Sequence, residues 1–350
     1  MNNHIFQSPS WQRGESRLVC VERWQETHDV TSFRFQGESR VKFHFKPGQF
    51  LTFLLQINGE GVARSYTISS SPSRPYSLVV TIKRIPGGLV SNYLIDNLQV
   101  GHSVNVLGPD GAFNLIDIPA EKYLFLSGGS GITPMYSMTR WLLDTQIGSD
   151  IAFIHSAKSL EDLIFNRELA EMARRHSQFR LNYTLESGES CPDLDTLDGR
   201  ISLAALQQLV PDFHERTIFV CGPAPYMKAV KTLLQQAEFD MSRYHQESFG
   251  DGAKATVENL DNGSQFMLQV DETNVALSAE QSVLDGVEQL KLPIIAACRS
   301  GICGACKCKV IEGEVESSSQ MTLTADEIAQ GYVLACSTKL KSDVTLSLNG

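Results

Sequence analysis

The chain contains 350 residues, of which 42% are hydrophobic and 20% charged, a composition typical of a globular protein with two or three domains. Its formal net charge of -10, from 30 basic and 40 acidic residues, disfavours nucleic acid or an anionic membrane as the main partner. The first twenty residues contain no unbroken apolar run, so we expect a cytoplasmic protein with neither a signal peptide nor a membrane anchor.

Residues 15–118 are expected to form an antiparallel β-barrel. Short runs in which apolar and polar residues alternate are separated by turns rich in Pro, Gly and Ser, as in strands with one buried face. These runs cover residues 18–22, 32–36, 50–57 and 78–82. One predicted helix, over residues 90–98, interrupts the strands.

Two motifs of this barrel carry groups that suit a dinucleotide. Arg64, Ser65, Tyr66 and Thr67 end one strand, and alternation puts Arg64 and Tyr66 on one side. There an aromatic ring can lie on an isoalloxazine, and a guanidinium can hold a phosphate. Gly88, Leu89, Val90 and Ser91 open the predicted helix, whose N-terminal amides, with the Ser91 hydroxyl, suit a pyrophosphate. One site could therefore serve one dinucleotide, although each motif taken alone is as well explained by a half-exposed strand and by a turn.

Residues 119–249 change to alternating strands and helices, which predicts a parallel α/β sheet. A glycine loop follows its first strand and enters a helix, so that bare amides can approach a pyrophosphate. The loop consists of Gly128, Gly129, Ser130, Gly131, Ile132, Thr133 and Pro134. Pro134 is expected at the first helical position, with Thr133 as the N-cap.

A second motif ends the strand over residues 218–220, at the edge where ligands of parallel sheets collect. It contains Cys221, Gly222, Pro223 and Met227. Taken alone, Cys221 is as well explained by a small buried apolar side chain.

Residues 250–264 are rich in Gly, Asn, Asp and Ser and are predicted to be a linker. Residues 265–350 begin with a predicted hairpin, followed by a helix that Ser282 caps, with Asp285 three residues later. Together with the cysteine loop that follows, these elements suggest a β-grasp domain.

Four cysteines in this last region have the spacing of plant-type 2Fe-2S ligands. They are Cys298, Cys303, Cys306 and Cys336. A structural zinc site also uses four cysteines, but usually as two C-x2-C-like pairs, so we favour a 2Fe-2S cluster. Cys308 lies beyond the spacing and is not expected to be a ligand.

Residues 17–249 resemble the ferredoxin-NADP reductase superfamily, through the R-x-Y-[ST] and G-x-x-S motifs and the stretch Pro47 to Phe50. The resemblance implies a flavin and hydride transfer from a nicotinamide; the phosphate site at the helix start fits FAD, and FMN is less favoured. It also puts Cys221 and Thr133 beside the reacting rings as catalytic residues, and Phe249 against the flavin. Near the second strand, Lys158 would suit NADPH, whereas Glu161 and Asp162 would suit NADH. We favour NADH, mainly on the resemblance.

The order of the three domains resembles reductases that pass single electrons to another protein. The most similar of these, by the cysteine loop and residues 321–336, are reductases of hybrid cluster proteins. The alternative is a reductase component of a Rieske-type oxygenase, for example one that demethylates a small betaine-like substrate. A third possibility, an electron carrier without NADH oxidation, would require the nicotinamide motifs to be vestigial.

Overall fold

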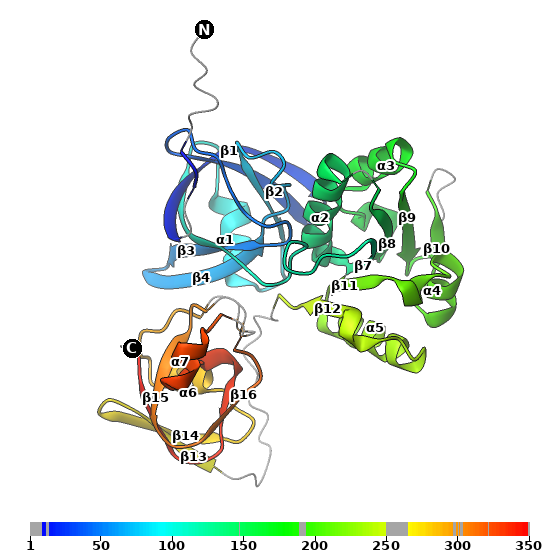
Figure 1. Cartoon of the computed structure of the whole chain (residues 1–350). Helices are drawn as coiled ribbons and strands as arrows, with labels where there is room; N and C mark the ends of the chain where they lie inside the picture. The colour runs from blue at the N-terminus through cyan, green and yellow to red at the C-terminus, as the bar shows by residue number, and fades with distance from the viewer. Residues whose placement is uncertain are drawn as a thin grey trace. The chain divides into compact units, whose positions relative to one another are not determined.

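The computed structural model describes residues 9–11, 14–146, 148–188, 194–249, 265–296, 299, 301, 304–320 and 322–348. The predicted linker, residues 250–264, lies outside this part of the chain. The chain forms two compact units, one of residues 1–53 and 66–249 and the other of residues 54–65 and 250–350 (Figure 1). In the described ranges, no helix has the length and apolar character needed to cross a membrane.

The predicted antiparallel barrel is confirmed. Its six strands pair in the order β4-β3-β6-β1-β2-β5. They are β1 (Gly14–Thr27), β2 (Val30–Gly37), β3 (Phe50–Ile57), β4 (Glu60–Thr67), β5 (Leu78–Lys83) and β6 (Ser103–Asp110). A bridge from Ile68, just after β4, to Val80 of β5 brings the two edges of the sheet together. The predicted helix is α1 (Leu89–Asn97), which follows β5.

The predicted parallel sheet is also confirmed, with the strand order β10-β9-β8-β7-β11-β12. Its strands are β7 (Lys122–Gly128), β8 (Asp150–Ala157), β9 (Phe179–Leu185), β10 (Thr196–Asp198), β11 (Thr217–Cys221) and β12 (Tyr244–Glu247). Its helices are α2 (Ile132–Thr145), α3 (Asn166–Arg175), α4 (Leu203–Leu209) and α5 (Ala224–Gln236). The strand order reverses between β7 and β11, and ligands of such sheets bind at the carboxyl edge of that point.

At the opposite edge of this sheet, Arg216 ties the amino ends of three strands together. Its side chain is completely buried. It donates to the Asp212 carboxylate at 3.1 and 2.6 Å, to the Asp150 carboxylate at 2.8 Å, and to the carbonyl oxygen of Tyr123 at 3.1 Å. The hydrogen bonds from Arg216 hold the pKa of the Asp212 carboxyl below its usual value.

We expect Arg216→Ala to lower the free energy of unfolding by about 3 kcal/mol, because it removes the buried guanidinium that bonds two carboxylates and a carbonyl oxygen, while Arg180, at 3.5 Å from each carboxylate, remains. Arg200→Ala is the matched control. The Arg200 side chain is 82% exposed and pairs with the exposed Glu186, so its loss should cost less than about 1 kcal/mol. Urea denaturation of both holoproteins measures the difference; equal midpoints would contradict the structural role of Arg216.

The C-terminal region forms a five-stranded sheet with the order β14-β13-β19-β15-β17, and a separate pair, β16 with β18. The strands are β13 (Gln265–Val270), β14 (Thr273–Ser278), β15 (Lys307–Glu312), β16 (Val315–Ser317), β17 (Tyr332–Leu334), β18 (Thr338–Leu340) and β19 (Val344–Ser347). Two short helices, α6 (Val283–Gln289) and α7 (Ala325–Ala329), accompany them. The predicted Ser282 and Asp285 capping box is present at the start of α6.

Candidate functional site

The first predicted flavin motif lies at the end of β4. Arg64, Ser65 and Tyr66 are half-buried, and Thr67 is 4% exposed. The Tyr66 ring stands edge-on to Phe53, with ring centroids 5.6 Å apart. The buried Thr67 hydroxyl has no hydrogen-bond partner among the described residues. An unsatisfied buried hydroxyl is costly in a folded protein, so a ligand that bonds to it would fit here.

The second motif forms the turn into α1. Gly87 has a φ of 70°, and Gly88 is the N-cap of α1, with no side chain capping the helix. The first amides of α1 are therefore available to an anion. The Ser91 hydroxyl, predicted to face a pyrophosphate, accepts a hydrogen bond from the Ile85 amide at 3.2 Å and so helps to close the turn. Leu89 is exposed and Val90 is buried.

The glycine loop after β7 forms a short 3-10 turn, η2 (Gly129–Gly131), before α2 begins at Ile132. A Cβ on Gly131 would lie 2.2 Å from the carbonyl oxygen of Cys221 and 2.5 Å from the amide nitrogen of Gly222. No side chain fits there, so the two predicted nicotinamide motifs meet through bare backbone. They meet at the carboxyl ends of β7 and β11, where the strand order reverses.

The expected start of α2 was wrong. Thr133 is not the N-cap, and Pro134 is the third rather than the first residue of the helix. The 3-10 turn leads directly into the α-helix, so Gly131 takes the cap position, and proline is tolerated anywhere in the first turn, where amides lack partners. The Thr133 hydroxyl instead donates to the Ser130 carbonyl oxygen at 3.1 Å. Its effect is to stabilise the loop.

Cys221 ends β11, and its side chain is completely buried in the core against α2. Burial, with the nearby Glu247 carboxylate, raises the pKa of the Cys221 thiol well above its usual value, so the thiol stays neutral. Met227, in the first turn of α5, is buried on the other face of the sheet. Phe249, the last described residue before the predicted linker, is 36% exposed.

Two of the four predicted cluster ligands lie outside the described residues, namely Cys298 and Cys303. The other two, Cys306 and Cys336, have sulfur atoms 3.2 Å apart, which is longer than a disulfide bond. The Gly301 amide donates to the Cys336 sulfur at 3.1 Å. Paired sulfur atoms that accept backbone hydrogen bonds fit the thiolates of an iron-sulfur cluster.

The glycines of the cysteine loop have no room for a side chain. Gly301 and Gly304 both have a φ of 73°. A Cβ would lie 2.6 Å from Ser319 at the first position and 2.8 Å from the Thr322 hydroxyl at the second. Cys308, which was not expected to be a ligand, packs in the core, and burial raises the pKa of its thiol to about 12.

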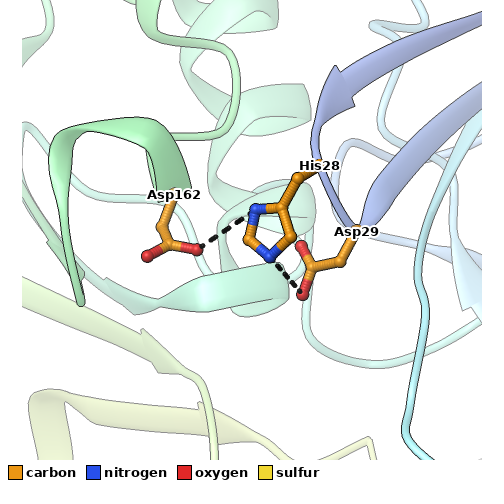
Figure 2. A group of neighbouring side chains, drawn as sticks. All are labelled: His28, Asp29 and Asp162. Atoms are coloured by element: carbon orange, nitrogen blue, oxygen red, sulfur yellow. Dashed lines mark ion pairs between the residues drawn. The ribbon is translucent and has the colours of Figure 1, made fainter.

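One group near the nicotinamide domain was not predicted from the sequence. Figure 2 shows the imidazole of His28, at the turn between β1 and β2, between the carboxylates of Asp29 and Asp162. Its Nδ1 lies 3.8 Å from Asp162, and its Nε2 lies 3.9 Å from Asp29. Each ring nitrogen faces a different carboxylate, and Lys83 already pairs with Asp29 at 3.1 Å. We therefore interpret the three residues as a contact between the barrel and η3 (Leu160–Asp162), not as a set of metal ligands.

Three family models match successive parts of the chain. Residues 17–115 match the oxidoreductase FAD-binding domain, residues 125–232 the oxidoreductase NAD-binding domain, and residues 267–341 the 2Fe-2S iron-sulfur cluster binding domain. The last match favours the 2Fe-2S cluster over the zinc alternative.

Relatives match nearly the whole chain. The glycine betaine monooxygenase reductase subunit of Chromohalobacter salexigens is 46% identical, over 96% of this chain and 96% of its own. The NADH oxidoreductase HCR of Escherichia coli is 32% identical, over 92% of this chain and 94% of its own. The solved structure of phthalate dioxygenase reductase has the same fold, with a TM-score of 0.63 at 24% identity, over 95% of this chain and 98% of its own.

The chain therefore belongs to the oxidoreductases in which FAD-binding and NAD-binding domains of the ferredoxin-NADP reductase type are joined to a C-terminal 2Fe-2S ferredoxin domain. It is an enzyme of this class, with FAD and a 2Fe-2S cluster as cofactors and NADH as substrate. The sequence resemblance ranked reductases of hybrid cluster proteins first. That ranking is not supported, because a monooxygenase reductase subunit is the more similar relative.

Proposed function

We propose that the protein is the reductase component of an oxygenase that acts on glycine betaine or a closely related quaternary ammonium compound. The observation that carries this proposal is the 46% identity, over 96% of both chains, to a glycine betaine monooxygenase reductase subunit. A hybrid cluster protein, the acceptor favoured from sequence, becomes the second candidate.

The residues of the nicotinamide site fit a binding and aligning role. When bound, FAD would supply a two-electron acceptor for the hydride of NADH, and a 2Fe-2S cluster would supply a one-electron carrier. In the proposed site, the glycine loop binds the pyrophosphate through its amides, and the buried Thr133 and Cys221 support the backbone beside the position of the nicotinamide. The pKa of Cys221 is far above neutrality, so this thiol serves by shape and not as an acid or base.

The remaining proposed residues bind the flavin and the cluster. Tyr66 covers the isoalloxazine, Arg64 and the start of α1 bind its phosphates, and Phe249 contacts the ring. Cys298, Cys303, Cys306 and Cys336 ligate the two irons.

Reconstitution with an oxygenase tests the proposed acceptor and substrate. Oxidative N-demethylation consumes one NADH, one proton and one O2 per methyl group and yields formaldehyde, water and NAD+. With purified glycine betaine oxygenase, we expect NADH oxidation to require the reductase, the oxygenase and glycine betaine. One formaldehyde should be released for each NADH oxidised. A reductase that oxidises NADH without supporting formaldehyde release at any ratio to oxygenase would refute the proposal.

The proposal includes selectivity for NADH. Lys158 and Glu161 are exposed at the end of β8, whereas Asp162 is held by the Ser159 hydroxyl at 2.8 Å and faces His28. Glu161 is thus the carboxylate left to bind a ribose and to repel a 2'-phosphate.

With ferricyanide as the electron acceptor, we expect kcat/KM to be at least about tenfold higher for NADH than for NADPH. This corresponds to a difference of roughly 1.4 kcal/mol in transition-state free energy. Glu161→Gln should lower the ratio of kcat/KM for NADH to kcat/KM for NADPH, while Lys158→Ala should change kcat/KM for NADH little. A ratio near one in the wild type would exclude a role of Glu161 in selecting NADH.

A further inference from the structure

Helix α2, which begins at the glycine loop, is hydrogen-bonded to the segment that follows β4. The Ser137 side chain is completely buried, and its hydroxyl donates to the carbonyl oxygen of Ser70 at 2.6 Å. Two turns later on α2, the Asp144 carboxylate accepts hydrogen bonds from the Ser73 hydroxyl at 2.6 Å and from Arg74 at 3.1 and 3.2 Å. We call these five residues the α2 clamp.

Hydrogen bonds fix the α2 clamp both at Asp144 on α2 and at Ser70 on the barrel. Burial alone would raise the pKa of the Asp144 carboxyl, but the hydrogen bonds from Arg74 and Ser73 hold it below the usual value, so Asp144 is charged at neutral pH. On the barrel side, the Ser70 hydroxyl accepts from the Val79 amide at 2.9 Å. The neighbouring Ser69 hydroxyl bonds to Thr81 at 2.9 Å. The clamp therefore joins α2 to a segment fixed on β5.

The α2 clamp lies close in sequence to both the flavin motif of β4 and the glycine loop. Ser70 lies three residues after Thr67, the last residue of the flavin motif on β4. Ser137 lies six residues after Gly131, within the continuous helix that starts at the loop. Less than two helical turns of α2 separate the Ser70–Ser137 hydrogen bond from the glycine loop. A shift of α2 at this hydrogen bond would therefore also shift the loop.

We propose that Ser137 is a positioning residue for hydride transfer, supported by Asp144, and that the α2 clamp sets the nicotinamide loop at the correct distance from the flavin strand. This inference rests on the proposed reaction of NADH with FAD. Hydride transfer requires reacting atoms in near contact, and small misplacements slow such steps far more than they weaken binding. Loss of the clamp should thus lower the rate of flavin reduction without weakening NAD+ binding.

The test compares Ser137→Ala with Thr139→Val in the full-length holoprotein. Thr139 is also completely buried on α2, but its hydroxyl has no hydrogen-bond partner among the described residues. Anaerobic stopped-flow bleaching of FAD at saturating NADH gives the reduction rate, and calorimetric titration with NAD+ gives the affinity. We expect Ser137→Ala to reduce the rate at least about fivefold with affinity within about twofold, and Thr139→Val to match the wild type.

Asp144→Asn provides a second variant at a partly exposed position, where folding is not at risk, and should slow bleaching in the same direction. A normal bleaching rate in both Ser137→Ala and Asp144→Asn would overturn the inference, as would a loss of NAD+ affinity that accounts for the whole effect. Wild-type FAD that NADH fails to bleach would overturn the proposed function together with this inference. These two failures are therefore distinguishable.

Discussion

Cys336→Ala is expected to abolish one-electron reduction of protein acceptors while leaving hydride transfer to FAD intact. Cys336 lies 3.2 Å from Cys306 and accepts a hydrogen bond from Gly301, so its sulfur is part of the proposed ligand set. With three thiolates left, the cluster should be lost or unstable, and cytochrome c reduction should fall at least about 100-fold. NADH oxidation by ferricyanide should stay within about twofold, because the nicotinamide motifs lie in the other compact unit.

Cys308→Ala is the matched control for this prediction. Cys308 is two residues from Cys306 and almost completely buried, but it packs against the apolar core of the domain. The variant should keep the visible absorbance of the cluster and the normal rate of cytochrome c reduction. If Cys336→Ala reduced cytochrome c as fast as Cys308→Ala does, electrons would not pass through the cluster.

Gly131→Ala is expected to block reduction by NADH. Its Cβ would lie 2.2 and 2.5 Å from backbone atoms of Cys221 and Gly222, and neither strand end can move away cheaply. The glycine loop must therefore shift from the end of β11. Since misplacement of reacting groups by about 1 Å can cost about 100-fold, we expect a loss of at least that size in the rate of FAD bleaching by NADH.

Gly148→Ala separates this effect from general backbone strain. Gly148 has a φ of 120°, so alanine strains the backbone there, whereas Gly131 has a φ of -63° that alanine adopts readily; among the described residues, a Cβ on Gly148 would meet nothing within 4 Å. We expect Gly148→Ala to bleach at nearly the wild-type rate. Both variants should retain FAD and be reduced normally by dithionite; Gly131→Ala bleached by NADH at the rate of Gly148→Ala would contradict the close contact between the two motifs.

Short sequence patterns predicted those helices and strands whose form depends on residues close together in the chain. The capping box at Ser282 and Asp285 was predicted from two side chains three residues apart, and the structure contains it. The strand runs of the barrel were predicted where a strand buries apolar residues, as β2, β3 and β5 do, whereas only Thr67 of β4 is buried. By contrast, α3 was not singled out from the sequence, because half of its ten residues are charged and only Leu169 and Met172 are buried.

Contacts between distant residues could not be predicted in this way. Ser70 and Ser137 are separated by 67 positions, and nothing in either local sequence indicates that they meet. The same is true of His28 and Asp162, which are brought together by the packing of the barrel turn against η3. The cap of α2 was predicted wrongly because Thr and Pro are common at helix starts, whereas the 3-10 turn of the loop moved the start to Ile132.

The acceptor is the part of the account that sequence motifs could not decide. The glycine loop and the cysteine spacing are requirements of NADH, FAD and the cluster, and these requirements are the same whichever protein receives the electrons. Similarity over the whole chain reversed the ranking drawn from the motifs.

Rapid anaerobic mixing of the NADH-reduced protein with each candidate acceptor tests the central claim most directly. Purified glycine betaine oxygenase and purified hybrid cluster protein would be mixed separately with the reductase, and acceptor reduction would be followed by its visible absorbance. The account predicts that the oxygenase is reduced at least about tenfold faster at equal concentration. Faster reduction of the hybrid cluster protein would contradict it.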